Sequence, residues 1–82
     1  MHYNDGDRYK GEWKNHKKEG KGIYYYNDGD RYEGEFKNDI KEGKGIYYNN
    51  NGDREMGDFL EGEKIRIHIT FHSDGDIISK YY

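Results

Sequence analysis

A unit of 23 residues repeats along this chain and limits the folds that it can adopt. The segment from Tyr26 to Tyr48 recurs almost unchanged one period earlier. At this period three sets of positions align, namely Gly6, Gly29, Gly52 and Gly75; Gly11, Gly34 and Gly57; and Trp13, Phe36, Phe59 and Tyr82. A repeat of this length is typical of a solenoid or of an array of hairpins. We therefore interpret residues 1–82 as one repeat domain, with repeats at about 3–25, 26–48 and 49–71 and a partial terminal repeat at 72–82.

The composition at first favours disorder, because 38% of the residues are charged and only 30% are hydrophobic. Two observations oppose this interpretation. The net charge is only −3, and ten tyrosines, three phenylalanines and one tryptophan recur at fixed places. Aromatic rings bury a large area each, and tyrosine also tolerates water. We expect a folded protein with a small core and, since it contains no cysteine, no disulfide bonds.

Two kinds of turn alternate along the chain, and strands are the only regular element predicted between them. N-D-G-D at 4–7 and 27–30, loosened at 50–53 and 73–76, is typical of hairpin loops, because glycine accepts positive φ. A second turn is expected at Asn15-His16, Asn38-Asp39 and Glu61-Gly62. The segments between the turns are rich in Tyr, Ile, Phe and Gly and lack helical spacing. The predicted fold is all-β, an elongated single-layer antiparallel meander of about three and a half stacked β-hairpins.

An odd period requires one loop of odd length in each repeat, because side chains alternate between the two faces of a strand. We place the odd loop at Asn27-Asp28-Gly29, with Gly29 in the left-handed bulge position, which sets Tyr24 opposite Tyr32 and Gly22 opposite Gly34. A two-residue turn at Asn38-Asp39 then sets Gly34 opposite Gly43, Tyr32 opposite Gly45 and Glu33 opposite Lys44.

This register predicts one face of large rings and bare glycines and an opposite face that is mainly charged. A glycine inside a strand needs a cover, and the neighbouring rings are the expected cover. The ring face is predicted to carry Tyr9, Trp13, Tyr24, Tyr26, Tyr32, Phe36 and Tyr47, with Gly11, Gly20, Gly22, Gly34, Gly43, Gly45 and Gly57. The opposite face is predicted to carry Lys10, Glu12, Lys21, Glu33, Glu35 and Lys44.

The ends of the array differ from its middle. Residues 65–71 replace both glycines of the repeat by Arg66 and His68, so we interpret residues 60–82 as a cap. At the start, His2-Tyr3 is predicted to be the stub of a strand. It would leave an open edge near Tyr3 and Tyr9 where a second copy could pair.

The segments Y-K-G-E-W at 9–13 with G-K-G at 20–22, and Y-E-G-E-F at 32–36 with G-K-G at 43–45, resemble MORN repeats (membrane occupation and recognition nexus). M-G-D-F at 56–59 is a third, divergent copy in which Glu55 replaces the tyrosine. The resemblance implies stacked hairpins with an aromatic groove and a scaffold role in cilia, the cytoskeleton or membrane junctions. It also implies a cytoplasmic location with cytoskeletal or membrane attachment.

The sequence contains no residue pattern typical of a catalytic or metal site, and we expect no enzyme activity, cofactor or metal site. The N-D-G-D turns lack the ligand spacing of a calcium loop. His68 and His72 share a strand face but would lie about 13 Å apart, so we interpret both as surface residues. Two serines and no cysteine leave little material for nucleophilic catalysis. The later repeats are acidic, which argues against a nucleic-acid partner.

We expect a protein or peptide partner to bind along the aromatic groove. The predicted contact residues are Trp13, Tyr24, Tyr26, Tyr32, Phe36 and Tyr47, because exposed apolar surface and these residue types are typical of interfaces. Pure packing of the same rings is an equally weighted interpretation. Homo-oligomerisation through the open edge and weak binding of anionic lipid through Lys14, Lys17 and Lys18 are the alternatives.

Overall fold

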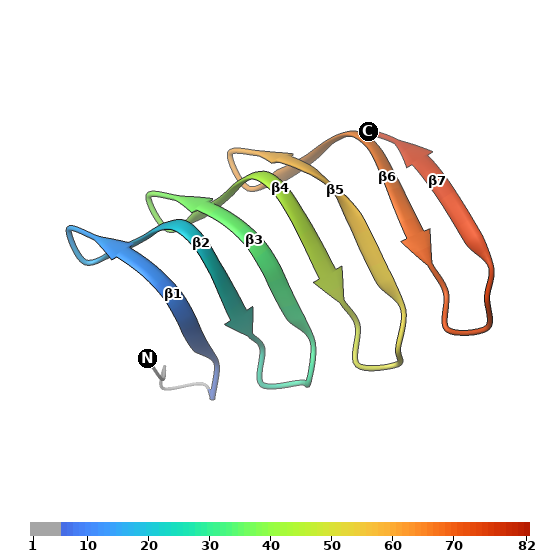
Figure 1. Cartoon of the computed structure of the whole chain (residues 1–82), viewed down its shortest axis with the longest axis horizontal. Helices are drawn as coiled ribbons and strands as arrows, with labels where there is room; N and C mark the ends of the chain where they lie inside the picture. The colour runs from blue at the N-terminus through green and yellow to red at the C-terminus, as the bar shows by residue number, and fades with distance from the viewer. Residues whose placement is uncertain (1–5) are drawn as a thin grey trace.

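The chain folds into one open antiparallel sheet of seven strands in sequence order, as a computed structural model of the chain shows for residues 6–82 (Figure 1). The strands are β1 Arg8–Lys14, β2 Lys17–Tyr25, β3 Arg31–Lys37, β4 Ile40–Tyr48, β5 Arg54–Leu60, β6 Glu63–Phe71 and β7 Ile77–Tyr81. The molecule measures 40 × 25 × 16 Å, and no second layer covers either face of the sheet in the described part of the chain (Figure 1). The all-β, single-layer meander is therefore confirmed. The predicted stub at His2-Tyr3, and the first two residues of the turn at 4–7, lie outside the described residues.

The two kinds of turn form as the sequence predicts. Asn38 and Asp39 have φ angles of 51° and 70° and connect β3 to β4, and the turns at 15–16 and 61–62 likewise have two positive φ values. Positive φ at both central residues matches the right-handed twist of hairpin strands. The other kind of turn joins one hairpin to the next. In the turn between β2 and β3, the Gly29 amide donates to the Tyr26 carbonyl at 3.1 Å, and Gly29 has a φ of 99°. The odd loop is therefore at the predicted place.

The register between β2 and β3 is the predicted one, whereas the register within the hairpin of β3 and β4 differs by two residues. Tyr24 pairs with Tyr32 and Gly22 with Gly34, as expected. Within the hairpin, however, Gly34 pairs with Gly45 and Tyr32 with Tyr47 rather than with Gly43 and Gly45. Glu33 pairs with Ile46 instead of Lys44.

A bulge near the middle of β4 causes this difference. Between the Gly34–Gly45 pair and the Phe36–Lys41 pair, the single residue Glu35 faces residues 42–44. Gly43 lies in this bulge with a φ of 71°, which glycine adopts at no steric cost. The same bulge recurs at Gly20 and at Arg66, whose φ values are 75° and 62°.

The bulge also corrects the predicted position of two glycines. A Cβ at Gly43 would point at the Glu35 carboxylate, and one at Gly20 would point at that of Glu12, so both are directed away from the rings. The glycines of the G-x-G pair thus have separate functions. The first forms the bulge, and the second, Gly22 or Gly45, is covered by a ring.

Rings that meet edge to face form the core, although the sheet has only one layer. Tyr9, Tyr32, Phe36 and Phe59 are at most 5% exposed. Consecutive centroids are 4.9 to 5.4 Å apart with interplanar angles of 77° to 90°, in the order Trp13, Tyr9, Phe36, Tyr32, Phe59, His68 and Tyr82. We call these seven rings the ring ladder. Edge-to-face pairs of this kind contribute about 0.5–1.5 kcal/mol each beyond area burial, which helps to explain how a chain with few aliphatic core residues folds.

Candidate functional site

Tyr9 and Tyr32, at equivalent positions of the first two repeats, are structural, because each ring covers the glycines beside it. A Cβ at Gly22 would run into the ring of Tyr9, and a Cβ at Gly45 would run into that of Tyr32. The Tyr9 hydroxyl donates to the Glu12 carbonyl at 3.0 Å, and that of Tyr32 donates to the Glu35 carbonyl at 3.4 Å. The strand therefore bends around the ring, and the ring fills the inside of the bend.

The structure divides the six predicted contact residues into two groups. Tyr32 is 0% exposed and Phe36 is 4% exposed. Both rings are enclosed by the ring ladder, so they have no surface to offer a partner. The candidate site therefore keeps four residues, which are Trp13, Tyr24, Tyr26 and Tyr47.

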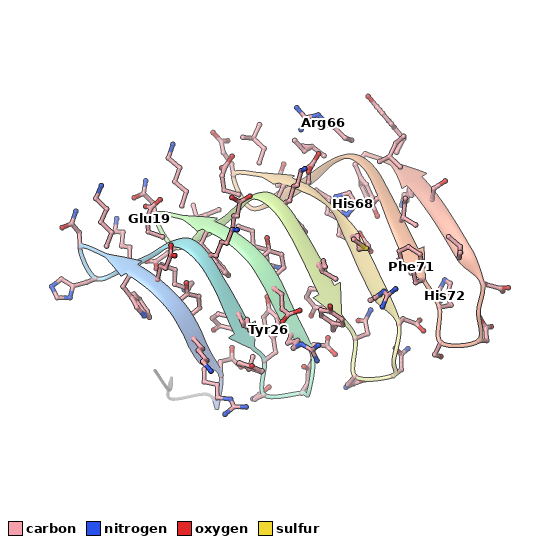
Figure 2. All side chains as sticks on the ribbon, in the orientation of Figure 1. Glu19, Tyr26, Arg66, His68, Phe71 and His72 are labelled. Carbon is pink, nitrogen blue, oxygen red and sulfur yellow. The ribbon has the colours of Figure 1, made fainter. Side chains whose placement is uncertain are left out.

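Three of these residues form a second aromatic row along the edge of the core. Tyr24 and Tyr26 have centroids 4.8 Å apart, and Tyr26 and Tyr47 have centroids 5.7 Å apart. All three are half-buried and pack against the core cluster. We call them the tyrosine row. Tyr26, labelled in Figure 2, lies beside the loop that joins β2 to β3. Trp13, 39% exposed, ends the ring ladder on β1.

Carboxylates at the loops accept hydrogen bonds from two of the three hydroxyl groups of the row. Tyr24 donates to Asp7 at 2.9 Å, and Tyr47 donates to Asp30 at 2.8 Å. Burial, followed by the hydrogen bond to Asp30, raises the pKa of Tyr47. Burial and the nearby aspartates raise the pKa of Tyr26 as well. The row therefore presents neutral rings with fixed orientation, which lowers the entropic cost of a contact.

Lysines lie over these rings. Lys18 is 5.3 Å from the centroid of Tyr24, and Lys41 is 5.2 Å from that of Tyr47. The Lys18 side chain is only 12% exposed and lies 3.6 Å from Asp39, so it is turned toward the ring face. Lys14 and Lys17, the other two predicted lipid contacts, are exposed on the neighbouring turn. The three lysines therefore do not form one exposed basic cluster.

His68 and His72 have structural contacts that the sequence did not predict. His68 is 1% exposed, and its interpretation as a surface residue is wrong. Its ring replaces the tyrosine ring that Glu55 cannot supply, and it lies between β5 and β6 (Figure 2). The signal was present in the sequence, because tyrosine is lost at position 55 in the same repeat in which glycine is replaced at position 68. His72 is partly exposed and lies 2.9 Å from Asp53.

A hollow lies on the face opposite the rings. Its volume is about 690 Å³, and it extends over the backbone of Gly11, Gly22 and Gly34. Charged residues line it, among them Lys21 paired with Glu35 across β2 and β3. On the ring face, the core rings are buried and the tyrosine row is partly buried against them. Residues 6–82 contain no cluster of His, Cys, Asp or Glu that could hold a metal ion.

Comparison with known proteins agrees with the repeat pattern. The family model described as MORN repeat matches residues 9–31 and 32–54, which together make up more than half of the chain. No curated protein matches the chain. The matched segments end just before Glu55, the position where the third repeat departs from the pattern.

Proposed function

Because this chain belongs to the MORN repeat family, whose repeats generally mediate protein or membrane interactions and are generally non-catalytic, we propose that it is a scaffold module that binds a protein segment on its ring face. The segment would lie along the tyrosine row and contact Trp13 at its end. Residues 1–82 would act as one repeat domain, with the repeats at 3–25, 26–48 and 49–71 and the terminal part at 72–82 as divided above.

The tyrosine row is the observation that supports this proposal. Its rings are half-buried, two of its hydroxyls donate to Asp7 and Asp30, and no second layer of the described chain covers it. Tyrosine and tryptophan contribute much of the energy of protein interfaces, because they bury a large area at a small entropic cost. No helix long and apolar enough to cross a bilayer occurs in residues 6–82.

Site-specific cross-linking tests the proposal. A photoreactive phenylalanine analogue at Tyr26 should cross-link the chain to a cellular protein, whereas the same analogue at Tyr81, 77% exposed on β7, should not. Trp13→Ala combined with Tyr26→Ala should then weaken binding of the purified partner more than tenfold, since interface aromatics commonly contribute 2 kcal/mol or more. Equal cross-linking from both positions, or unchanged binding by a folded double variant, would contradict the proposal.

Self-association is a second candidate, because β7 has an apolar surface at the edge of the sheet. Ile77, Ile78 and Tyr81 are 65%, 54% and 77% exposed. Terminal repeats usually present a polar outer face, whereas this strand exposes apolar side chains. An edge strand with apolar side chains is prone to pair with another chain. Sedimentation over a concentration series should show association that Ile78→Lys removes, and a strict monomer at high concentration would rule this candidate out.

A further inference from the structure

Two lysines spaced by one repeat, Lys18 and Lys41, occupy equivalent aromatic cages on the ring face, and Lys64 one repeat later lies over a single ring. Lys18 lies 5.3 to 5.9 Å from the centroids of its three rings, and Lys41 lies 4.8 to 5.7 Å from the centroids of its four. The Lys18 cage consists of Tyr9, Tyr24 and Phe36; the Lys41 cage of Tyr32, Tyr47 and Phe59, the same positions one period later, with Tyr26 in addition. Lys64 lies 5.3 Å from the ring centroid of Tyr82.

A carboxylate accompanies the first and the third lysine. Lys18 Nζ lies 3.6 Å from Asp39 Oδ1, and the same oxygen accepts the Lys18 backbone N–H at 2.7 Å. Lys64 Nζ lies 2.9 Å from Glu55 Oε2. An ammonium taken partly out of water is stabilised by such a partner.

The middle lysine lacks this partner. The position that Asp39 occupies beside Lys18 is occupied beside Lys41 by Gly62, which has no side chain. The two turns are otherwise alike, because the Asp39 amide donates to the Lys18 carbonyl at 3.0 Å and the Gly62 amide donates to the Lys41 carbonyl at 3.1 Å. Within residues 6–82, no carboxylate lies within ion-pair distance of Lys41 Nζ. Burial, and secondarily the charge of Lys64, lower the pKa of Lys41, the direction expected for an uncompensated ammonium.

We propose that Lys41, caged by Tyr26 and Tyr47 and left open at Gly62, binds a carboxylate side chain of an acidic peptide segment. This inference rests on the proposed function, because it assigns one contact of the segment on the tyrosine row. Asp39 serves as the template, since its carboxylate accepts a hydrogen bond from the Lys18 backbone N–H and forms an ion pair with the Lys18 ammonium. The Lys41 ammonium and backbone N–H would be the matching donors.

The surrounding charge disfavours an anionic membrane surface as the occupant of this subsite. The chain carries a net charge of −3, and Asp28 and Asp30 lie close enough to Tyr26 to raise its pKa. Anionic membrane surfaces attract clusters of basic residues, whereas a single caged ammonium suits a single carboxylate.

Substitution at Gly62 provides the test. Gly62→Asp places an internal carboxylate over Lys41, and Gly62→Asn is its matched neutral control. Asp and Asn both tolerate the left-handed backbone at position 62, as Asp39 does at a φ of 70°. The added Cβ lies 3.1 Å from Ile40 Cγ2, so both substitutions need the same small shift of that side chain. The probes are a blocked glutamate-rich peptide, its glutamine counterpart and vesicles containing phosphatidylserine. Backbone and lysine NMR resonances are followed during each titration.

We expect the glutamate peptide to shift the resonances of Lys41 and Gly62 and to bind roughly tenfold more tightly than the glutamine peptide, the effect of one charge-assisted contact. Gly62→Asn should keep this ratio, and Gly62→Asp should abolish it. Equal binding of the two peptides, or a ratio that survives Gly62→Asp, would overturn the carboxylate subsite. So would the absence of any shift at Lys41, or vesicle binding that alone responds to Gly62→Asp. Cross-linking from Tyr26 is measured separately, so the broader proposal can stand if this one fails.

Discussion

The imidazole of His68 lies over Gly57, in the place where a tyrosine ring lies over the equivalent glycines of the first two repeats. Its Nε2 is 2.8 Å from the Asp58 carbonyl, the counterpart of the carbonyls that accept the hydroxyls of Tyr9 and Tyr32. Its Nδ1 is 2.8 Å from Glu55 Oε2, and the same oxygen lies 2.9 Å from Lys64 Nζ. The third repeat therefore keeps its core by supplying the ring from β6 instead of β5.

Restoring the pattern of the first two repeats should compensate for the loss of this ring. His68→Gly alone should lower the free energy of unfolding by about 2–4 kcal/mol, since it opens a cavity and removes one of the two partners of the Glu55 carboxylate, leaving only Lys64. Adding Glu55→Tyr should recover at least half of that loss, because the new ring would cover Gly57 as Tyr32 covers Gly34. Urea unfolding of His68→Gly, of Glu55→Tyr and of the double variant gives a double-mutant cycle. Purely additive effects would show that the two positions do not substitute for each other.

Gly45→Ala should destabilise the sheet through contact with the Tyr32 ring rather than through the backbone. The added Cβ would meet the ring atoms of Tyr32, which is fully buried and cannot move aside. Overpacking of this kind costs about 1–3 kcal/mol and occasionally more. Gly75→Ala is the comparison, because it has open space and only its φ of 100° opposes a side chain. Thermal unfolding should therefore show a larger loss for Gly45→Ala, and equal losses would contradict the role of the ring.

High pH should destabilise the protein through the buried tyrosines. Burial is the largest cause that raises the pKa of Tyr26, Tyr32 and Tyr47 above the ordinary value of 10.0. Below pH 10.0 the hydroxyls are neutral in both states, so their contribution is fully present, and above it the unfolded chain ionises first. Stability should fall as the pH rises through that range. Absorbance of the tyrosinate band should show that Tyr26, Tyr32 and Tyr47 are among the tyrosines that ionise only together with unfolding. Titration of all ten in the folded state would contradict this expectation.

Low pH should destabilise the protein through protonation of Asp53. The Ser73 backbone N–H, followed by the hydrogen bond with His72, lowers the pKa of Asp53 below its ordinary value of 3.8. The stabilising contribution is therefore present above 3.8 and is lost as the pH falls through the lower value in the folded state. Asp53→Asn should flatten the acid side of the stability profile below about pH 4, with little change in its slope near neutrality. An unchanged acid limb in urea unfolding would show that Asp53 does not contribute.

Much of the fold followed from local patterns. The left-handed turns at 38–39 and the odd loop at Gly29 depend on residues that tolerate positive φ, so they could be placed from the sequence. The register of β2 and β3 followed from that loop. The bulge at Gly43 could not be placed, because a glycine in a strand pattern is equally consistent with a covered ring site.

The sequence by itself determined the period, the strands and the side of the sheet that carries the rings, because each depends on neighbours in the chain. Only the tertiary structure decided which rings are enclosed and which remain accessible. Tyr32 and Tyr26 are the same residue type, yet one lies inside the ring ladder and the other at its edge. The exposure of a ring depends on rings contributed by other strands, as do the burial of His68 and the unpaired charge of Lys41. Those contacts exist only after the bulges have set how the hairpins stack.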